Sequence, residues 1–264
     1  MTLKELEHIL LDLEKPSEAL ERADRAGELD NSPELRALRG VQQDPTWHPE
    51  GDVWIHTMLV IDEAARLRER LSDRDEQFAL MLGAVAHDFG KAVTTVFKDG
   101  RWRSPGHEAR SVDLAEAWLA RLGADEKLIE EVKKYCREHM NISHLYKARA
   151  VVKPSTIKRL ASRIDIRKLA LLAEADYKGR IFPGGREKDE SVKWMLEKLS
   201  EAEREPPHIK PLLTGKILLR LGFREGETLG KVLREALGLQ RAGELTNIRQ
   251  AILWALNRKP SGKK

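Results

Sequence analysis

The sequence has a single cysteine, few aromatic residues and no long apolar run. Because Cys136 has no partner in the chain, an internal disulfide is excluded, and the protein fits a reducing compartment. No apolar run approaches the ~20 residues that a membrane-spanning helix needs. Aromatic residues make up 5% of the chain, and valine, isoleucine and threonine are scarce, which argues against a β-rich fold. No internal repeat or low-complexity segment interrupts the sequence.

Leucine, alanine and charged residues dominate instead. Of the 264 residues, 41% are hydrophobic and 34% are charged, a balance that favours helices around an apolar core. Acidic residues at Glu5, Glu7, Asp12 and Glu14 occupy what would be the apolar part of a signal peptide. We therefore expect a cytoplasmic, mostly helical protein without membrane segments.

The net charge of +4 is unevenly distributed. Residues 1–40 hold six basic and ten acidic side chains, a net of −4, so the remainder carries +8. The densest basic segment runs from Lys147 to Lys168. It predicts a surface that attracts RNA or another polyanion, although an ordinary solvated helix face gives the same pattern. The candidate RNA-binding residues are Lys147, Arg149, Lys153, Lys158, Arg159 and Arg163.

Helix-start and helix-stop residues divide the chain into short helices. The Asp99-Gly100 pair within residues 93–103 predicts a hairpin. Pro183-Gly184-Gly185 is the best candidate boundary between domains. Expected helix starts are Asp52, Ser72 or Asp73, Asp125, Pro154, Thr214, Thr228 and Thr246, and expected stops are Gly90, Gly123 and Gly179.

Five of the eight histidines have neighbours of a type suited to metal binding. His87 and Asp88 end an apolar helical segment, and Asp176 also lies near a helix end. A carboxylate is disfavoured there by the helix dipole, a cost that a divalent cation would offset. A lone histidine on a helix is usually a surface or hydrogen-bonded residue, so the set as a whole carries the metal hypothesis.

The order His56, His87-Asp88, Asp176 resembles the signature of the HD-domain metal-dependent phosphohydrolases. The segments TWHPEGDVWIHT, AHDFGKAVTT, GRWRSPGHEA, EHM and EADYKGR are similar to the HD domain of bacterial tRNA nucleotidyltransferases, the CCA-adding enzymes. The tail LLTGKILLRLGFREGETLGKVLREALGLQRAGELT resembles the helical C-terminal region of that family. The resemblance covers about residues 34–257. Ile217 departs from it, because the family pattern has an acidic residue there.

The resemblance implies an all-α fold, with an HD-domain helical core, a short hairpin-like insertion and a C-terminal cluster of short helices. The expected regions are an N-terminal helical segment at 1–33, the HD domain at 34–190 and the C-terminal region at 191–264. It also implies a divalent metal cofactor, as two ions of Mn, Mg, Ni, Co or Fe bridged by Asp88. The implied ligands are His56, His87, Asp88, His107, His139 and Asp176.

The resemblance further implies that Lys91 and Arg180 bind phosphate and act in catalysis beside Asp88. The expected reactions are phosphomonoester and 2′,3′-cyclic phosphodiester hydrolysis on nucleotides or RNA ends. One alternative is hydrolysis of 5′-nucleotides or nucleoside triphosphates. Because fewer residues precede the HD region than a nucleotidyltransferase head requires, the other alternative is a non-catalytic tRNA-binding body that partners a separate nucleotidyltransferase.

The remaining histidines and the cysteine are not expected to bind metal or substrate directly. His48 shapes the pocket entrance or is structural, and His144 is a loop residue or lies behind a ligand. No role is assigned to His8 or His208. Cys136 is expected to be a small buried apolar residue.

Overall fold

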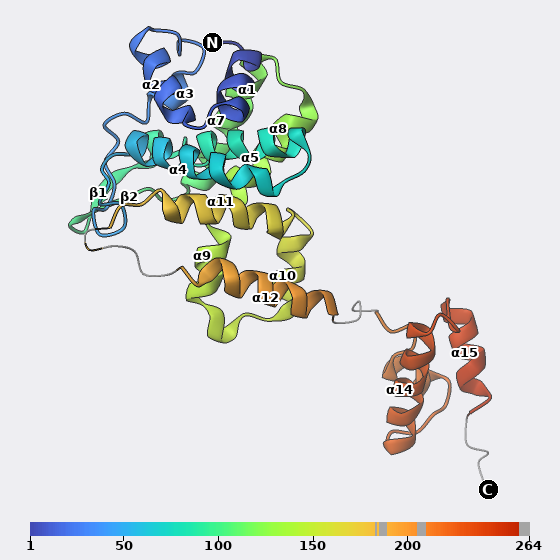
Figure 1. Ribbon diagram of the computed structural model, residues 1–264. Coiled ribbons are helices and arrows are strands. Elements are labelled where there is room, and N and C mark those ends of the chain that lie inside the picture. The colour runs from blue at the N-terminus through green and yellow to red at the C-terminus, as the bar shows by residue number, and fades with distance from the viewer. Residues whose placement is uncertain (183, 185–188, 205–209, 259–264) are drawn as a thin grey trace, which may run out of the picture. The chain divides into compact units, whose positions relative to one another are not determined.

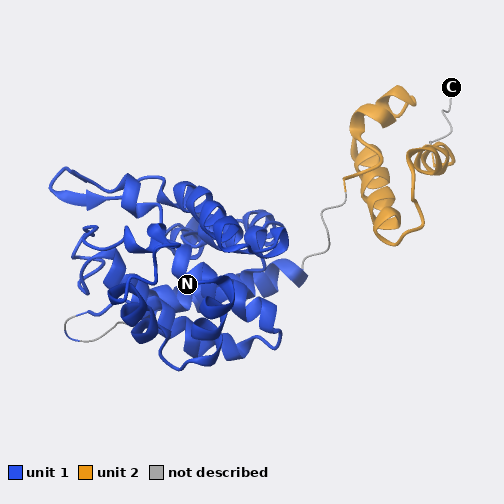
Figure 2. Ribbon diagram, turned by 90° about the horizontal axis from the view of Figure 1, so that it is seen from above, with its two compact units in different colours: residues 1–204 blue, residues 205–264 orange. Residues whose placement is uncertain are grey.

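The computed structural model describes residues 1–182, 184, 189–204 and 210–258. The chain divides into two compact units, residues 1–204 and residues 205–264 (Figure 2). The described chain is mostly helical with one two-stranded hairpin (Figure 1), which confirms the expected fold class. None of its described helices is both long and apolar enough to cross a membrane. Of the Pro183-Gly184-Gly185 break, Pro183 and Gly185 lie outside the described residues.

The N-terminal segment packs into the same core as the helices that follow it. Leu6, Leu10 and Leu20 are buried in one apolar cluster with residues from Val53 onward. Thr2 caps the first helix, since its hydroxyl accepts a hydrogen bond from the amide of Glu5. The helices of this segment are α1 (Leu3–Asp12), α2 (Pro16–Arg25) and α3 (Pro33–Arg36).

Three of the five central helices of the first unit begin at the aspartates expected to cap them. Asp52, Asp73 and Asp125 each accept a hydrogen bond from a backbone amide in the first turn. Helix α5 ends at Ala86, before the expected stop at Gly90, so His87 and Asp88 lie just beyond it. The central helices are α4 (Val53–Leu67), α5 (Arg74–Ala86), α7 (His107–Leu122), α8 (Glu126–Glu138) and α11 (Ile166–Lys178). The 3₁₀ turn η1 (Arg68–Arg70) follows α4.

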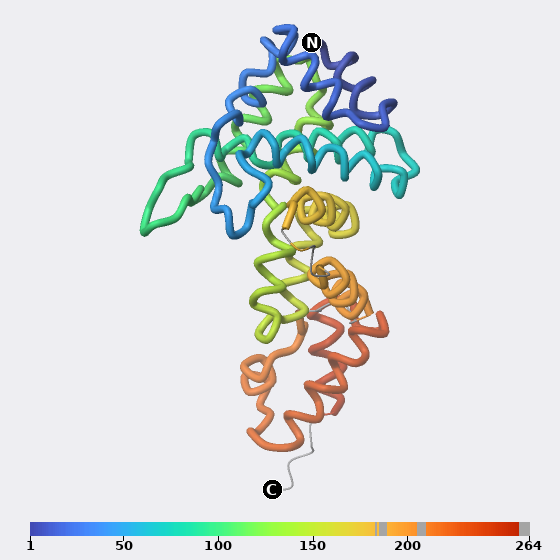
Figure 3. The backbone as a smooth tube through the Cα atoms, turned by 60° about the vertical axis from the view of Figure 1, so that its left-hand side comes forward, coloured from blue at the N-terminus to red at the C-terminus, as the bar shows by residue number. Residues whose placement is uncertain are grey.

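The expected hairpin is present between α6 (Lys91–Thr94) and α7. Strand β1 (Val96–Lys98) pairs antiparallel with β2 (Arg101–Arg103), with Phe97 opposite Trp102. Asp99 and Gly100 both have positive φ, at 54° and 73°, which gives the connecting turn the twist that a two-residue hairpin needs. The hairpin projects from the helical body (Figures 1 and 3).

The remaining helices of the first unit follow α8 along the chain and pack against one another or against α11. Helix α12 contacts α9, α10 and α11, so residues 191–204 are part of the first unit. The expected boundaries after residues 33 and 190 separate regions that resemble different parts of the related family, and they remain predictions. These elements are α9 (Asn141–Lys147), η2 (Arg149–Val151), α10 (Pro154–Ala161) and α12 (Ser191–Arg204).

The second unit has its own small apolar core. Leu218, Val232 and Ala251 are buried within it. Thr214 caps its first helix as expected, whereas Gly226 and Asn247, and not Thr228 and Thr246, precede the next two. The helices are α13 (Gly215–Arg220), α14 (Glu227–Arg241) and α15 (Ile248–Leu256).

Two glycines permit close backbone approaches that bring distant segments together. A Cβ on Gly90 would lie 2.1 Å from the carbonyl oxygen of His107, so the turn after α5 can touch the start of α7 only with glycine there. A Cβ on Gly179 would lie 2.6 Å from a methyl group of Val60, at the contact of α11 with α4. These approaches place the turn after α5 beside the start of α7, and the end of α11 beside α4.

Candidate metal centre

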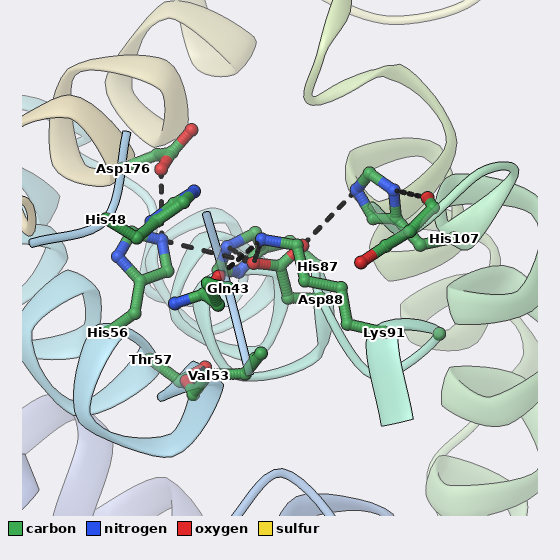
Figure 4. A network of polar contacts seen from close by, with 12 residues as sticks. Gln43, His48, Val53, His56, Thr57, His87, Asp88, Lys91, His107 and Asp176 are labelled. Carbon is green, nitrogen blue, oxygen red and sulfur yellow. Dashed lines mark hydrogen bonds and ion pairs between the residues drawn. The ribbon is translucent and has the colours of Figure 1, made fainter. Parts of the chain in front are cut away.

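Helix ends and one helix face converge at a buried cluster of histidine and aspartate side chains (Figure 4). His56 points inward from the first turn of α4, and Asp176 lies in the last turn of α11. His87 and His139 are the C-caps of α5 and α8, and His107 is the first residue of α7. Apart from the more accessible Asp176, these side chains are at most 9% exposed. The residues brought together include every one of the expected ligands: His56, His87, Asp88, His107, His139 and Asp176.

Asp88 lies at the centre and presents its two oxygens to different histidines. Oδ2 lies 3.2 Å from His87 Nε2 and 4.0 Å from His56 Nε2. Oδ1 lies 3.3 Å from His107 Nε2 and 3.8 Å from His139 Nε2. His56 Nε2 is also 3.1 Å from Asp176 Oδ1. The cluster therefore consists of two groups of ligand atoms that share the Asp88 carboxylate.

The histidines are held from behind through their other ring nitrogens. The Nδ1 atoms of His87, His107 and His139 each lie 2.9 Å from a backbone carbonyl oxygen, those of Ala84, Ser104 and Cys136. A carbonyl can only accept, so the proton is on Nδ1 and the Nε2 lone pair faces the cluster when the ring is neutral. This tautomer and orientation are those of metal-bound imidazoles.

The His107–His139 contact tests directly whether a cation fits. Their Nε2 atoms lie 3.2 Å apart, and in neutral rings with protonated Nδ1 neither Nε2 atom has a hydrogen to donate. Burial lowers the pKa of His139 to about 3, so its ring is neutral near pH 7. Two facing lone pairs repel each other, whereas a cation bound to both nitrogens and to Asp88 Oδ1 would satisfy them. Imidazole and carboxylate ligands together suit first-row divalent metals.

The first group gives the same result by its unpaired atoms. Among the described residues, the Nε2 atoms of His56 and His87 are buried without a hydrogen-bond partner of acceptable geometry. Buried polar atoms are normally paired, because leaving one unpaired costs about 1–3 kcal/mol. Both nitrogens lie within 4.0 Å of Asp88 Oδ2, and this set of ligand atoms fits a divalent ion.

Charges around the cluster favour ionised carboxylates. Burial by itself raises the pKa of Asp88, but Lys91 and His87 outweigh it and hold this pKa well below the ordinary value. Burial likewise opposes ionisation of Asp176, and the guanidinium of Arg180 holds its pKa far below normal. The carboxylate of Asp88 also overcomes burial at His87 and raises the pKa of that ring. Both carboxylates of the cluster are thus ionised, the state in which a carboxylate binds a cation.

The two cations expected to bind phosphate lie at the cluster. Lys91 Nζ is 2.7 Å from Asp88 Oδ2 and also donates a hydrogen bond of 2.8 Å to Gln43 Oε1. Arg180 Nη2 lies 3.0 and 2.9 Å from the two oxygens of Asp176. Both side chains line the cavity above the cluster.

Sequence reasoning missed Glu50, a fully buried carboxylate behind the cluster. Its Oε1 lies 2.8 Å from His56 Nδ1 and 2.9 Å from His48 Nδ1. Burial raises the pKa of Glu50, but hydrogen bonds from His48 and His56 outweigh it and keep the pKa well below normal. Glu50 therefore directs the Nε2 of His56 inward. The signal in the sequence was the segment WHPEGD, in which only the histidine drew attention.

The cluster forms the floor of a cavity of about 220 Å³. His48 is on its wall, with its ring edge-to-face against His56 and its pKa lowered by burial to about 4. Lys147 is the candidate RNA-binding residue that lines this cavity. Of the others, Arg163 makes a bidentate pair with the buried Glu138, with N–O distances of 2.7 and 2.9 Å.

The other candidate RNA-binding residues lie after Lys147 in the sequence. Arg149 lies in η2 with its guanidinium over the ring of Tyr146, and Lys153 precedes α10. Lys158 and Arg159 are in the last turn of α10.

The remaining residues considered from sequence lie outside the cluster. His144 is exposed in α9, and His8 is exposed beside Asp12 in α1. His208 is outside the described residues. Cys136 is buried as expected, and burial raises the pKa of its thiol.

Comparison with known proteins finds an HD domain in part of the chain. Residues 53–179 match the HD domain family. The multifunctional CCA protein of Paraburkholderia phytofirmans is 37% identical over 175 residues, which are 63% of this chain and 40% of that protein. The multifunctional CCA protein of Alkalilimnicola ehrlichii is 35% identical over 157 residues, 56% of this chain and 35% of that protein.

A third relative, the multifunctional CCA protein of Burkholderia pseudomallei, is 36% identical over 156 residues, or 35% of its length. The chain thus spans between about a third and two fifths of these relatives. It carries an HD domain that resembles the HD region of the multifunctional CCA proteins. The HD-domain match and the buried histidine and aspartate cluster are consistent with a metal-dependent phosphohydrolase.

Proposed function

We propose that the HD domain of this chain hydrolyses phosphate esters at the 2′ and 3′ positions of nucleotides or RNA ends, including 2′,3′-cyclic phosphodiesters. The observation that carries the proposal is the division of Asp88, one oxygen toward His56 and His87 and the other toward His107 and His139. Such a shared carboxylate fits two adjacent divalent ions, an arrangement typical of phosphoryl-transfer sites.

The first ion would be held by His56, His87, Asp88 and Asp176, and the second by Asp88, His107 and His139. When bound, the ions would polarise phosphoryl oxygens and lower the pKa of water. The protein supplies the anionic floor and fixes each imidazole through its Nδ1 hydrogen bond.

Lys91 and Arg180 would bind the phosphoryl oxygens of the substrate. Each is paired with a carboxylate of the cluster, Lys91 with Asp88 and Arg180 with Asp176, and each lines the cavity. The pairing fixes their positions and leaves their charge to offset the negative charge that develops on the phosphoryl group. Asp88 thus positions both an ion and a phosphate-binding cation.

A nucleotide or RNA end is favoured over other esters by the relatives and by the basic residues. The relatives are CCA proteins by name, and Lys147 lines the cavity at the start of the basic segment. Arg149, Lys153, Lys158 and Arg159 would extend contact along an RNA backbone, and Arg163 less so because it is paired with Glu138.

Turnover tests the proposal. Phosphate release or ring opening is measured with 2′,3′-cyclic AMP, 2′-AMP, 3′-AMP, 5′-AMP and ATP, in EDTA and with Mg²⁺, Mn²⁺, Ni²⁺ or Co²⁺. We expect metal-dependent hydrolysis of the first three, abolished in Asp88→Asn and retained in the control Asp113→Asn, an exposed position on α7.

Other results of the turnover assay would favour one of the alternative functions. Preference for 5′-AMP or ATP would favour a 5′-nucleotide or triphosphate hydrolase. Absence of turnover with every metal would contradict the hydrolase and favour an RNA-binding body that acts with a separate nucleotidyltransferase.

A further inference from the structure

The mouth of the metal cavity carries an exposed tryptophan that the proposed chemistry does not use. Trp47 lies in the loop between α3 and α4, lines the same cavity as Asp88 and Arg180, and is 51% exposed. Exposing half of an indole costs hydrophobic free energy that burial in the core would recover. The position suits a residue whose ring is covered by a ligand.

A second tryptophan lines the cavity from the hairpin. Trp102 is half-buried and faces Phe97 across the strand pair, with ring centroids 5.1 Å apart. This edge-to-face contact fixes the indole from one side. Residues 41–52 and the hairpin lie beside each other (Figures 1 and 3), and Trp47 and Trp102 from these two segments line the same cavity.

Positive charge accompanies the two rings. Lys147 Nζ lies 5.2 Å from the centroid of Trp47, within the range of a cation–π contact. Arg103, next to Trp102 on β2, also lines the cavity. Aromatic faces next to basic side chains are how proteins bind single nucleotides, because every base has a π-face and every linkage has a phosphate.

We propose that Trp47 and Trp102 form a base-binding subsite at the mouth of the metal cavity, with Lys147 and Arg103 beside it. The inference rests on the proposed function and sharpens it, because it requires a nucleobase in the substrate. A phosphate ester of an alcohol without a base is then a poorer substrate than a nucleotide. The ligand chemistry is a terminal nucleoside with a 2′ or 3′ phosphate, either free or at the end of an RNA.

Binding and turnover test the subsite separately. Binding of 3′-AMP and of base-free glycerol 2-phosphate is followed by quenching of tryptophan fluorescence, in EDTA and with Mn²⁺. We expect quenching by 3′-AMP, and a rise of its dissociation constant of roughly 5- to 100-fold in Trp47→Ala, since stacking on one aromatic ring accounts for about that factor. Trp47→Phe, which retains a flat ring, should recover most of the affinity.

Rates of hydrolysis measure the preference for a substrate that carries a base. We expect the ratio of kcat/KM for 3′-AMP to that for glycerol 2-phosphate to fall roughly 5- to 100-fold in Trp47→Ala and in Trp102→Ala. Trp254→Ala, a tryptophan outside the cavity lining, should leave the ratio unchanged. An RNA oligonucleotide with a 2′,3′-cyclic phosphate end, compared with 2′,3′-cyclic AMP, distinguishes the two sources of the nucleoside.

Two results would overturn the subsite: equal affinity for 3′-AMP in wild type and Trp47→Ala, or equal loss of both substrates in the variants. A wild-type protein that binds 3′-AMP through Trp47 and hydrolyses neither ester would keep the subsite and contradict the phosphohydrolase. Metal-dependent turnover together with equal affinity for 3′-AMP in wild type and Trp47→Ala would contradict the subsite and keep the phosphohydrolase.

Discussion

At the scale of single residues, Asp88 lies between two groups of histidines and Glu50 lies behind His56. The structure brings the six expected ligands together, and their binding of metal stays a prediction. His87-Asp88 is a local sequence signal, and His56, His107, His139 and Asp176 follow from a family pattern that names positions. Glu50 acts through His48 and His56, and a buried carboxylate next to a glycine has no distinctive spacing. Its role depends on the path of the loop before α4, which only the folded chain reveals.

The pair formed by Arg180 and Asp176 leads to a prediction about catalysis. Replacing Arg180 with alanine removes a cation that lines the cavity but none of the metal ligands. We expect Arg180→Ala to keep its bound metal, measured by atomic absorption, and to lose about 10²–10³-fold in kcat on 2′,3′-cyclic AMP. Loss of the metal together with the activity would show that Arg180 supports the ligands instead.

Glu50 leads to a prediction about metal affinity. Glu50→Gln preserves the shape of the side chain and removes the charge that orients His56. Because partners behind metal-bound histidines typically contribute 10–100-fold to affinity, we expect a loss of roughly that size in Mn²⁺ titrations. The control is Glu34→Gln, a buried carboxylate paired with Arg121 away from the cluster. Equal Mn²⁺ affinity in wild type and Glu50→Gln would remove Glu50 from the site.

At the scale of elements, several helix starts and the helix stops at Gly123 and Gly179 were predictable, whereas the end of α5 was not. Asp52, Asp73 and Asp125 satisfy amides through their own side chains, so a local sequence rule suffices. The end of α5 at Ala86 depends on tertiary contacts, because Gly90 is needed for the approach to His107 and not for stopping the helix. The stop expected at Gly90 was therefore four residues late.

The close approach at Gly90 predicts coupling between packing and metal binding. A Cβ there would meet backbone atoms of His107 and Ser111 at 2.1 and 2.8 Å, which no side-chain rotation can relieve. We expect Gly90→Ala to lower the free energy of unfolding by about 1–3 kcal/mol and to weaken Mn²⁺ binding by displacing His107. Chemical denaturation and Mn²⁺ titration measure the two effects.

Gly238→Ala is the matched control for that substitution. Gly238 lies within α14, and a Cβ there would meet nothing within 4 Å. Replacement with alanine should leave Mn²⁺ binding unchanged and stabilise the second unit slightly. Unchanged Mn²⁺ affinity in Gly90→Ala would contradict the link between the turn after α5 and the metal group of His107.

At the scale of the whole molecule, the sequence predicted an all-α chain, and the structure divides it into two compact units after residue 204. The expected domain boundary after residue 190 concerns relatedness and stays a prediction, while Met195 and Leu199 of α12 are buried in the core of the first unit. Leu213 and Leu218 begin a separate core. Which apolar faces meet depends on packing, and periodicity along a helix does not encode it.

The separate cores predict two thermal transitions, of which metal stabilises one. Because the candidate ligands all lie in the first unit, Mn²⁺ at 100 times its dissociation constant should stabilise that unit by about 2.7 kcal/mol per site and leave the second unchanged. Calorimetry of the full chain measures this, with Leu80→Ala and Leu218→Ala to identify the transitions. A metal-dependent shift confined to the transition of the second unit would contradict the metal site in the first unit.

The most direct measurement titrates metal-free protein with Mn²⁺ while following bound ions and hydrolysis of 2′,3′-cyclic AMP in the same samples. The two ligand groups that share Asp88 predict binding of two ions per chain, with hydrolysis appearing as the second ion binds. Asp88→Asn should neither bind the pair nor hydrolyse the substrate. Two bound ions without hydrolysis, or full hydrolysis in EDTA, would contradict the assignment of a two-ion phosphohydrolase.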